Sequence, residues 1–386
     1  MKVYLDNSAT SWPKPKQVIQ SMNEYLNDFG GSPGRSGHQF AIKAAREIFE
    51  TRELISALFH VDSSEKIIFT ANATHALNIA IKGVLKKGDH VIISHMEHNA
   101  VVRPLRFLES IGIIELTVVP CNKKGYIDLE ILKKSFQKNT KLVVSIHGSN
   151  VSGTIQPIKE IGEICKTNRV LYLVDAAQTA GIIPIDMQES HIDLLAFTGH
   201  KKLYGPPGIG GLCIQNNLMI DTLIHGGTGS KSEMETHPEF YPDRLEAGTA
   251  NTVGIIGLKA GVNYILQKGI DHLYNKQNEL ITYFISLLEK MDDIIIYGPN
   301  KNEERLSLVS VNIRNMPCSD FAYKLDKEFN IMVRPGLHCS PLAHKSIGSF
   351  PEGTVRFSLG CFNAEKEIMY TIDAIKKIIV DQKKSI

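Results

Sequence analysis

The sequence predicts an α/β protein with a large, doubly wound, mostly parallel sheet and a second, smaller α+β domain. Short apolar segments alternate with amphipathic helical segments through the middle of the chain, which is typical of βαβ units. The 386 residues exceed what one hydrophobic core usually serves, so two domains are expected. Beyond a long helical stretch at residues 253–291, strands and helices follow in a different order.

The expected elements follow one another regularly. In the predicted large domain, residues 15–257, strands are expected at 65–70, 90–95, 141–149, 170–178 and 194–200, and helices at 73–85, 100–111 and 158–168. The predicted small domain combines residues 1–14 with 258–386, with strands at 293–298, 306–313 and 354–360 and helices at 319–329 and 365–379. Doubly wound sheets bind ligands beyond the carboxyl ends of their strands, so the residues there are the candidates for chemistry.

The composition is that of a soluble globular protein, with 43% hydrophobic and 22% charged residues. The 43 basic and 41 acidic residues nearly balance, which argues against nucleic acid or an anionic membrane as a partner. The start, MKVYLDNSAT, has no apolar signal segment, and no apolar run approaches the ~20 residues that span a bilayer. Six scattered cysteines without a CxxC pair favour a reducing compartment. We therefore expect a cytoplasmic enzyme.

Polar side chains follow several of the expected strands. Asp175 and Lys201 each come after a strand, Thr74 opens a helix after another, and Asn150 follows a fourth. Taken alone, Asp175 could cap a helix, and the Thr74 helix start could be an ordinary N-terminus. Together these residues offer an acid, a primary amine, a phosphate seat and an amide at one edge of the sheet.

This set of groups suits pyridoxal 5'-phosphate as a cofactor. The amine forms a Schiff base with the aldehyde, and the acid keeps the pyridine nitrogen protonated so that the ring accepts electrons. His98 offers a flat neighbour for the ring. His95 and His98 also form an HxxH pair that zinc could use, but no third ligand supports it. We therefore expect no metal.

A series of motifs in a fixed order gives the sequence a family resemblance. YLDNSAT, ATHALN, MEHNA, SNVSGT, VDAAQ, TGHK, EAGTAN, VRPGLHC and VRFSLG follow one another from residue 4 to residue 360. The sequence resembles the class V aminotransferase family of fold type I pyridoxal-phosphate enzymes, and most of all its cysteine desulfurase and selenocysteine lyase branch. The resemblance runs nearly from end to end.

The resemblance implies a role for each matching residue. It places the cofactor on Lys201, which follows the histidine of TGHK, and leaves Lys202 as a solvated or phosphate-facing side chain. Thr249 in EAGTAN is implied to reach the phosphate of a neighbouring subunit, and hence a homodimer. The remaining implied contacts are Asp175 with the pyridine nitrogen, His98 stacked on the ring, Gln178 and Asn150 on the phenolic oxygen side, and Thr74, His75, Thr198 and His200 at the phosphate.

Cys339 adds a nucleophile to these groups. It lies beside Arg334 and His338, and neighbouring positive charge favours a thiolate. From the local sequence alone, a small packing residue in a turn explains it slightly better. The resemblance implies the persulfide-forming cysteine, which acts with Lys201 and His98 in catalysis. We interpret the other five cysteines as packing residues.

Arg356 lies in an apolar strand pattern, which makes a surface ion pair a poor explanation for it. The resemblance implies that Arg356 binds the substrate carboxylate, with Arg334 and Asn150 in the same pocket. A guanidinium group can form two parallel hydrogen bonds to a carboxylate and so fix its orientation.

The expected activity is that of a cysteine desulfurase, which converts L-cysteine to L-alanine and passes sulfur from Cys339 to an acceptor protein or small thiol. The short segment after Cys339 resembles group II of this branch. Ser340, where the family commonly has alanine, and Ser32, where asparagine is common, leave the acceptor and exact substrate open. A selenocysteine lyase acting on L-selenocysteine and another class V aminotransferase activity remain alternatives. The presence of Lys201 and its partner residues disfavours a non-catalytic binding module.

Overall fold

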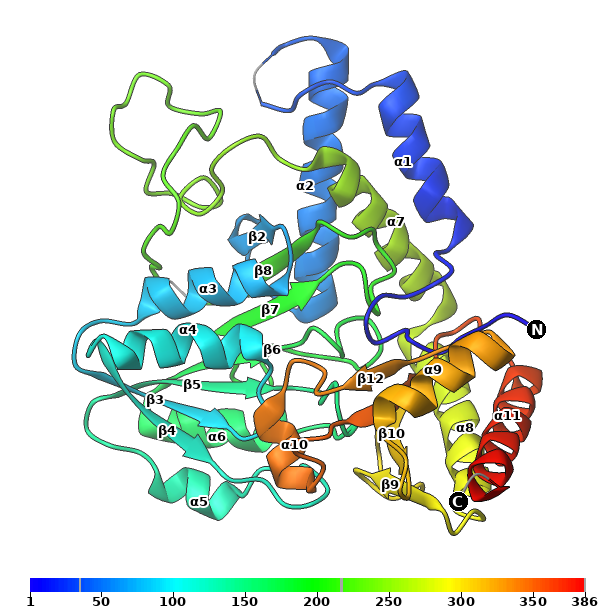
Figure 1. Cartoon of the computed structure of the whole chain (residues 1–386). Coiled ribbons are helices and arrows are strands. Elements are labelled where there is room, and N and C mark those ends of the chain that lie inside the picture. The colour runs from blue at the N-terminus through cyan, green and yellow to red at the C-terminus, as the bar shows by residue number, and fades with distance from the viewer. Residues whose placement is uncertain (35, 216–217, 385–386) are drawn as a thin grey trace.

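The computed structural model describes residues 1–34, 36–215 and 218–384, and a seven-stranded sheet lies at its centre (Figure 1). In sheet order the strands are β2 (Ile67–Thr70), β8 (Gly210–Ile214), β7 (Leu194–Thr198), β6 (Leu171–Asp175), β5 (Thr140–Ile146), β3 (Asp89–Ser94) and β4 (Ile114–Val119). β8 runs antiparallel to both of its neighbours, and the other adjacent pairs are parallel. This large, mostly parallel sheet confirms the predicted fold class.

Helices cover both faces of the large sheet, which is why its central strands are apolar throughout. All five residues of β7 are buried. The core on one face includes residues of α3 (Ala73–Val84) and α4 (Asn99–Ser110). The core on the other face includes residues of α2 (Gln39–Phe59), α6 (Ile158–Asn168) and α7 (Thr252–Lys268). η1 (Ser64–Lys66) and α5 (Leu129–Lys134) complete the elements of this part.

Sequence reasoning missed the two helices at residues 16–59. The structure forms α1 (Lys16–Asp28) and α2 there; both pack against α7, and their upper ends project beyond the large sheet (Figure 1). Large apolar residues lie exposed on them: Ile19, Leu26, Phe40, Ile42 and Phe49. Apolar residues on the outer faces obscure the single apolar stripe by which an amphipathic helix is recognised.

A smaller antiparallel sheet and its helices form the second part of the molecule, the small-sheet part. The seven-stranded sheet and its helices are the large-sheet part. Its order is β12 (Arg334–Gly336), β13 (Thr354–Ser358), β10 (Leu308–Ile313) and β9 (Ile294–Tyr297). Its core includes residues of α8 (Ile270–Leu288), α9 (Cys318–Phe329) and α11 (Glu365–Lys384). α10 (Pro341–Ile347) lies between β12 and β13 in the chain.

The first residues of the chain join the second part. β1 (Val3–Tyr4) pairs in parallel with β11 (Ile331–Met332). Val3 and Leu5 belong to the core of the small sheet. The expected boundary at residues 257 and 258 stays a prediction, and it falls within α7, whose buried Ile255 and Ile265 both lie in the core of the large sheet.

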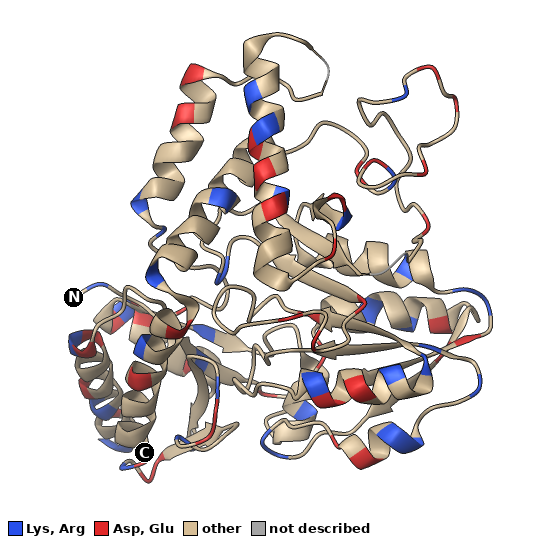
Figure 2. Cartoon of the chain, turned by 180° about the vertical axis from the view of Figure 1, so that it is seen from behind, with Lys and Arg blue, Asp and Glu red and all other residues tan. Residues whose placement is uncertain are grey.

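Lysine, arginine and acidic residues are interspersed over the helices (Figure 2). None of the helices in the described ranges has both the length and the apolar character needed to cross a membrane.

Candidate active site

A cavity opens at the carboxyl ends of the large-sheet strands, where the sequence predicts the chemistry. The residues that line it are Asn72, Ala73, Thr74, His98, Ala100, Ile146, Asn150, Asp175, Ala177, Gln178, Thr198, His200 and Lys201. The structure thus brings together eight of the predicted residues: Thr74, His98, Asn150, Asp175, Gln178, Thr198, His200 and Lys201.

Lys201 and Asp175, a base and an acid, both line this cavity. Burial lowers the pKa of Lys201 to about 8, against the opposing attraction of Asp175. Burial likewise raises the pKa of Asp175, opposed by the Ala177 N–H, which donates to Oδ1 at 2.9 Å, and by Lys201. A lysine that loses its proton this readily can act as a nucleophile and then as a base near neutral pH.

The polar atoms around the cavity fit a phosphorylated aromatic aldehyde. Within the described part of the chain, Thr198 Oγ1, His200 Nδ1 and Gln178 Oε1 are buried without a hydrogen-bond partner. α3 begins at Ala73, and its N-terminus faces the cavity through Ala73 and Thr74. A helix N-terminus with unpaired polar groups beside it is suited to binding a phosphate.

His98 is positioned at the cavity by the start of α4. It is the N-cap residue, and its Nδ1 accepts a hydrogen bond from Ala100 N at 3.0 Å. Burial, together with nearby Lys201 and Arg334, lowers the pKa of His98 to about 4, so the ring is neutral. A neutral ring fixed at a helix start is suited to stacking on an aromatic cofactor.

The neighbouring His95 is engaged elsewhere, since its Nδ1 lies 2.9 Å from Ser346 Oγ. Across the residues that the structure describes, no three His, Cys, Asp or Glu side chains are grouped as a metal site would require.

Cys339 lies exposed in a tight turn between β12 and α10. His338 and Cys339 both adopt the left-handed conformation, at φ 48° and 59°, which is uncommon for residues other than glycine. Asn150 holds the turn from both sides: its Nδ2 donates to His338 O at 2.7 Å, and its Oδ1 accepts from Ser340 Oγ at 3.0 Å. The N–H of Asn99 also donates to Cys339 O at 2.8 Å. The turn is therefore short and fastened to the large-sheet part.

The positive charge beside Cys339 comes from Arg334. Its Nη2 lies 3.6 Å from the Cys339 Sγ, within hydrogen-bonding distance of the sulfur. The expectation that His338 also supplies charge is wrong, because burial lowers the pKa of His338 well below its usual value. His338 is instead a neutral, buried residue whose Nε2 lies 3.2 Å from Thr354 Oγ1.

Arg356 lies behind the cavity wall and is only 1% exposed. Its Nη1 donates to Asn150 O at 3.0 Å, and its Nη2 donates to Asp6 Oδ1 at 2.8 Å. A guanidinium carries five N–H donors, so these two bonds orient Arg356 without using all of its donors. Asp6 is a positioning residue that sequence reasoning missed, although it lies in the motif YLDNSAT.

Two further predictions about site residues have different outcomes. Lys202 is neither solvated nor directed at a phosphate: it is 3% exposed and bonded to Gln277, Ser307 and Leu359. His75 and Thr249 line a second opening, next to the first, and not the Lys201 cavity itself. Any contact of Thr249 with a phosphate therefore stays a prediction.

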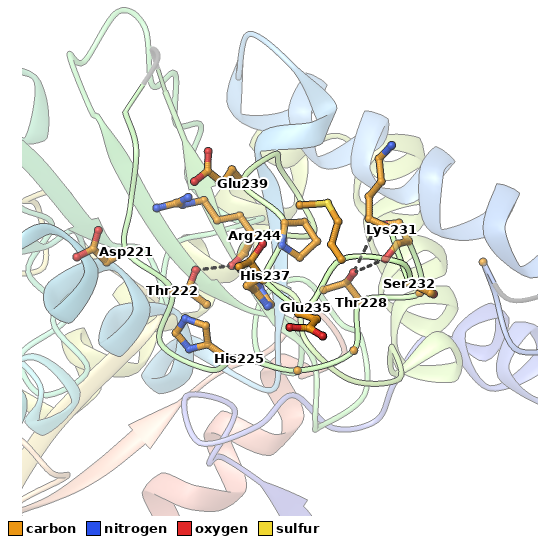
Figure 3. Close-up of a pocket in the computed structure, with 18 residues that line it drawn as sticks. Asp221, Thr222, His225, Thr228, Lys231, Ser232, Glu235, His237, Glu239 and Arg244 are labelled. Atoms are coloured by element: carbon orange, nitrogen blue, oxygen red, sulfur yellow. Dashed lines mark hydrogen bonds between the residues drawn. The ribbon is translucent and has the colours of Figure 1, made fainter.

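A second, larger cavity of about 1280 Å³ lies away from this site. It is enclosed mainly by residues 221–244, within a loop that extends from the large-sheet part (Figures 1 and 3). Thr222 and His237 bond to the carbonyl of Arg244, and the rings of His225 and His237 lie 5.2 Å apart. These contacts support the loop's own conformation, so the smaller Lys201 cavity is the better candidate for catalysis.

Comparisons with known proteins identify the relatives of this chain. Residues 3–370 match the family described as aminotransferase class-V. The chain is 35% identical to the cysteine desulfurase IscS of Dictyoglomus turgidum, covering 98% of this chain and 94% of that one. It is 33% identical to a probable cysteine desulfurase of Methanothermobacter thermautotrophicus, with 97% and 94% covered. The apo structure of a cysteine desulfurase from Thermococcus onnurineus superposes with a TM-score of 0.91, at 30% identity, covering 98% and 95% of the two chains.

Proposed function

Because the chain belongs to the class V aminotransferase family, we propose that it is a pyridoxal-phosphate-dependent cysteine desulfurase that converts L-cysteine to L-alanine. The observation that supports this proposal most strongly is the exposed Cys339 thiol, whose Sγ lies 3.6 Å from Arg334 Nη2. Asn150, which lines the Lys201 cavity, holds the turn that contains Cys339 through a hydrogen bond to His338 O. Relatives and structural neighbours named cysteine desulfurase support the same activity.

Different residues of the cavity would bind different parts of the cofactor. With pyridoxal phosphate bound, Lys201 would hold it at its aldehyde, Asp175 would pair with the pyridine nitrogen, and His98 would stack on the ring. Thr74, Thr198 and His200 would bind the phosphate. When bound, the cofactor withdraws electrons from the α-carbon of the substrate.

The chain's own side chains then carry out the sulfur transfer. Arg356 would bind the substrate carboxylate, and the Lys201 amine would take the α-proton. The Cys339 thiolate attacks the substrate sulfur: an S–S bond forms, the carbon–sulfur bond breaks, and its electron pair stays on carbon. Protonation of that carbon gives the methyl group of alanine, Lys201 returns a proton to the α-carbon, and Cys339 carries the persulfide.

The fastened turn bears on how sulfur leaves the enzyme. With His338, Cys339 and Ser340 all bonded to the large-sheet part, Cys339 has little freedom to carry sulfur outward. An acceptor therefore comes to the site, as a small thiol or as a protein with a protruding cysteine. The six free cysteines support a reducing, cytoplasmic setting.

Product analysis tests the proposed activity. The purified protein, loaded with pyridoxal phosphate and given a reducing thiol, should release equal amounts of L-alanine and sulfide from L-cysteine. L-selenocysteine is assayed in parallel. High turnover with selenocysteine and almost none with cysteine would instead assign a selenocysteine lyase.

Asp175→Asn is expected to retain bound cofactor but to lose most of its turnover. A neutral amide cannot stabilise the protonated pyridine nitrogen, and the loss of one such electrostatic partner typically costs about 10²–10³ in kcat. Steady-state alanine formation, normalised to bound cofactor, measures the effect. A variant with parental kcat would show that Asp175 serves only as a cap for the Ala177 N–H.

We also propose that two copies of the chain assemble and complete each other's sites. The loop that contains residues 221–244 exposes Ile224, Met234 and Phe240, and exposed apolar residues of this size are typical of interaction surfaces. Thr249 follows this loop and lines the opening beside the Lys201 cavity. In the dimer, it would reach the phosphate site of the partner subunit.

Mixing two inactive variants tests this assembly. Lys201→Ala subunits and Thr249→Ala subunits are unfolded together, refolded and assayed. Each mixed dimer should regain one intact site, with Lys201 from one copy and Thr249 from the other, whereas either variant refolded alone stays inactive. A parental protein that is fully active as a monomer at assay concentration would contradict the proposal.

A further inference from the structure

We propose that Lys202 is a positioning residue, whose buried ammonium sets the distance between the lysine that binds the cofactor and the arginine that binds the substrate carboxylate. The inference rests on the proposed roles of Lys201 and Arg356. It assigns to the second lysine of TGHKK a function in the reaction that differs from that of the first.

The side chain of Lys202 crosses from the large-sheet part to the small-sheet part. Its Nζ donates to Gln277 Oε1 on α8 at 2.9 Å, to Ser307 Oγ at 3.0 Å, and to Leu359 O at 3.0 Å. These three acceptors match the three N–H donors of an ammonium group. The residue is 3% exposed, so the arrangement is a complete, buried coordination of the cation.

The acceptors of Lys202 are themselves joined into one cluster. Ser307 Oγ lies 3.0 Å from Gln277 Oε1 and 3.1 Å from Leu359 O, and Leu359 N donates to Ser307 O at 2.8 Å. Ser307 directly precedes β10, and Leu359 directly follows β13. Lys202 therefore fastens the ends of two adjacent small-sheet strands to the turn after β7.

This attachment leads directly to the substrate-binding arginine. Arg356 lies in β13, three residues before Leu359, and its side chain bonds to Asp6 and to Asn150 O. On the other side, Lys202 adjoins Lys201, whose side chain lines the cavity. One ammonium thus links the backbone that carries Lys201 to the strand that carries Arg356.

Stability alone gives a poor explanation for a lysine at this position. All three acceptors are uncharged, and burial, together with the positive Arg356, lowers the pKa of Lys202 to about 8 from 10.5. Because the unfolded chain holds this proton more tightly, the buried charge costs folding free energy below pH 8, and the cost falls as the pH rises from about 8 to 10.5. No carboxylate pairs with this ammonium to offset that cost, because its three acceptors are an amide, a hydroxyl and a carbonyl oxygen.

Lys202→Met therefore separates a positioning role from a structural one. In the enzyme loaded with cofactor, this variant should keep parental cofactor content and absorption spectrum. Its KM for L-cysteine should rise on the order of tenfold with kcat nearly unchanged, because a displaced Arg356 weakens binding of the carboxylate in ground and transition states alike. Gln277→Leu, which removes one acceptor and leaves the lysine, should raise KM less.

Lys276→Met is the matched control. Lys276 lies on α8, one residue before Gln277, and donates to Cys361 O at 2.8 Å. Like Lys202 it bonds to a carbonyl just beyond β13, but it is not adjacent to Lys201 in the chain. This variant should have parental KM. If Lys202→Met has parental KM, or a lowered melting temperature with KM unchanged, the inference is overturned. If Lys202→Met does not fold, parental KM in Gln277→Leu overturns it. If the parental protein itself makes no alanine from L-cysteine, the proposed function fails instead.

Discussion

Cys339→Ala should abolish the formation of alanine from L-cysteine while leaving a measurable rate with L-selenocysteine. The carbon–sulfur bond is broken here by attack of a thiolate on sulfur, and the exposed Cys339 beside Arg334 supplies that thiolate. The carbon–selenium bond is weaker than the carbon–sulfur bond, so selenium can be released as Se(0) without a protein nucleophile. The electron pair of that bond then stays on carbon, which is protonated to the methyl group of alanine. Alanine is measured with both substrates, and the peptide that contains Cys339 is examined by mass spectrometry for one added sulfur atom.

The matched control is Cys318→Ala. Cys318 is half-buried at the start of α9, and its Sγ donates to Glu352 O, so this variant should keep parental turnover and the added sulfur on Cys339. A Cys339→Ala variant that desulfurates cysteine at the parental rate would make Cys339 a packing residue and remove the main support for the proposed activity.

Lys201→Ala should remove both the covalently bound cofactor and all turnover. Lys201 is the amine that lines the cavity with Asp175, whereas Lys202 is bonded to the small-sheet part. After reduction with borohydride, the parental protein should carry the cofactor's mass on the peptide that contains Lys201. Lys202→Met should carry it too, and Lys201→Ala should not. Labelling of Lys202 in the parental protein would reverse the assignment.

The same lysine predicts how cofactor uptake depends on pH. Only a neutral amine attacks the aldehyde, and burial lowers the pKa of Lys201 to about 8. In the protein without cofactor, the rate of uptake should therefore rise with pH and level off above about pH 8. Stopped-flow absorbance of added pyridoxal phosphate measures this rate.

The sequence predicts the large sheet well because its strands are apolar runs that end in polar residues. Asp175 and Lys201 could be identified because the carboxyl ends of β6 and β7 are adjacent in the sheet. β4 and β8 were not among the expected strands. β8 reads GGLCI, and its two glycines weaken the signal of a strand.

The contacts that orient the site were much harder to predict. The bond between Asp6 and Arg356 spans 350 positions of sequence, and that between Asn150 and His338 spans 188. No local pattern indicates such pairs. The prediction for Lys202 was wrong because a lysine in a loop is usually solvated. Only the packing of the two sheets against each other places Gln277, Ser307 and Leu359 within hydrogen-bonding distance of its ammonium group.

The pairing of β1 with β11 and of Asp6 with Arg356 also has a consequence for synthesis on the ribosome. At about 5–20 residues per second, Asp6 is made roughly 20–70 s before Arg356. All seven strands of the large sheet are present once residue 214 has been added. The nascent chain therefore contains all the strands that end around Lys201 well before it contains Cys339 or Arg356. The thiol and the lysine can meet only after residue 339 has been added, so a shorter chain cannot form the proposed persulfide.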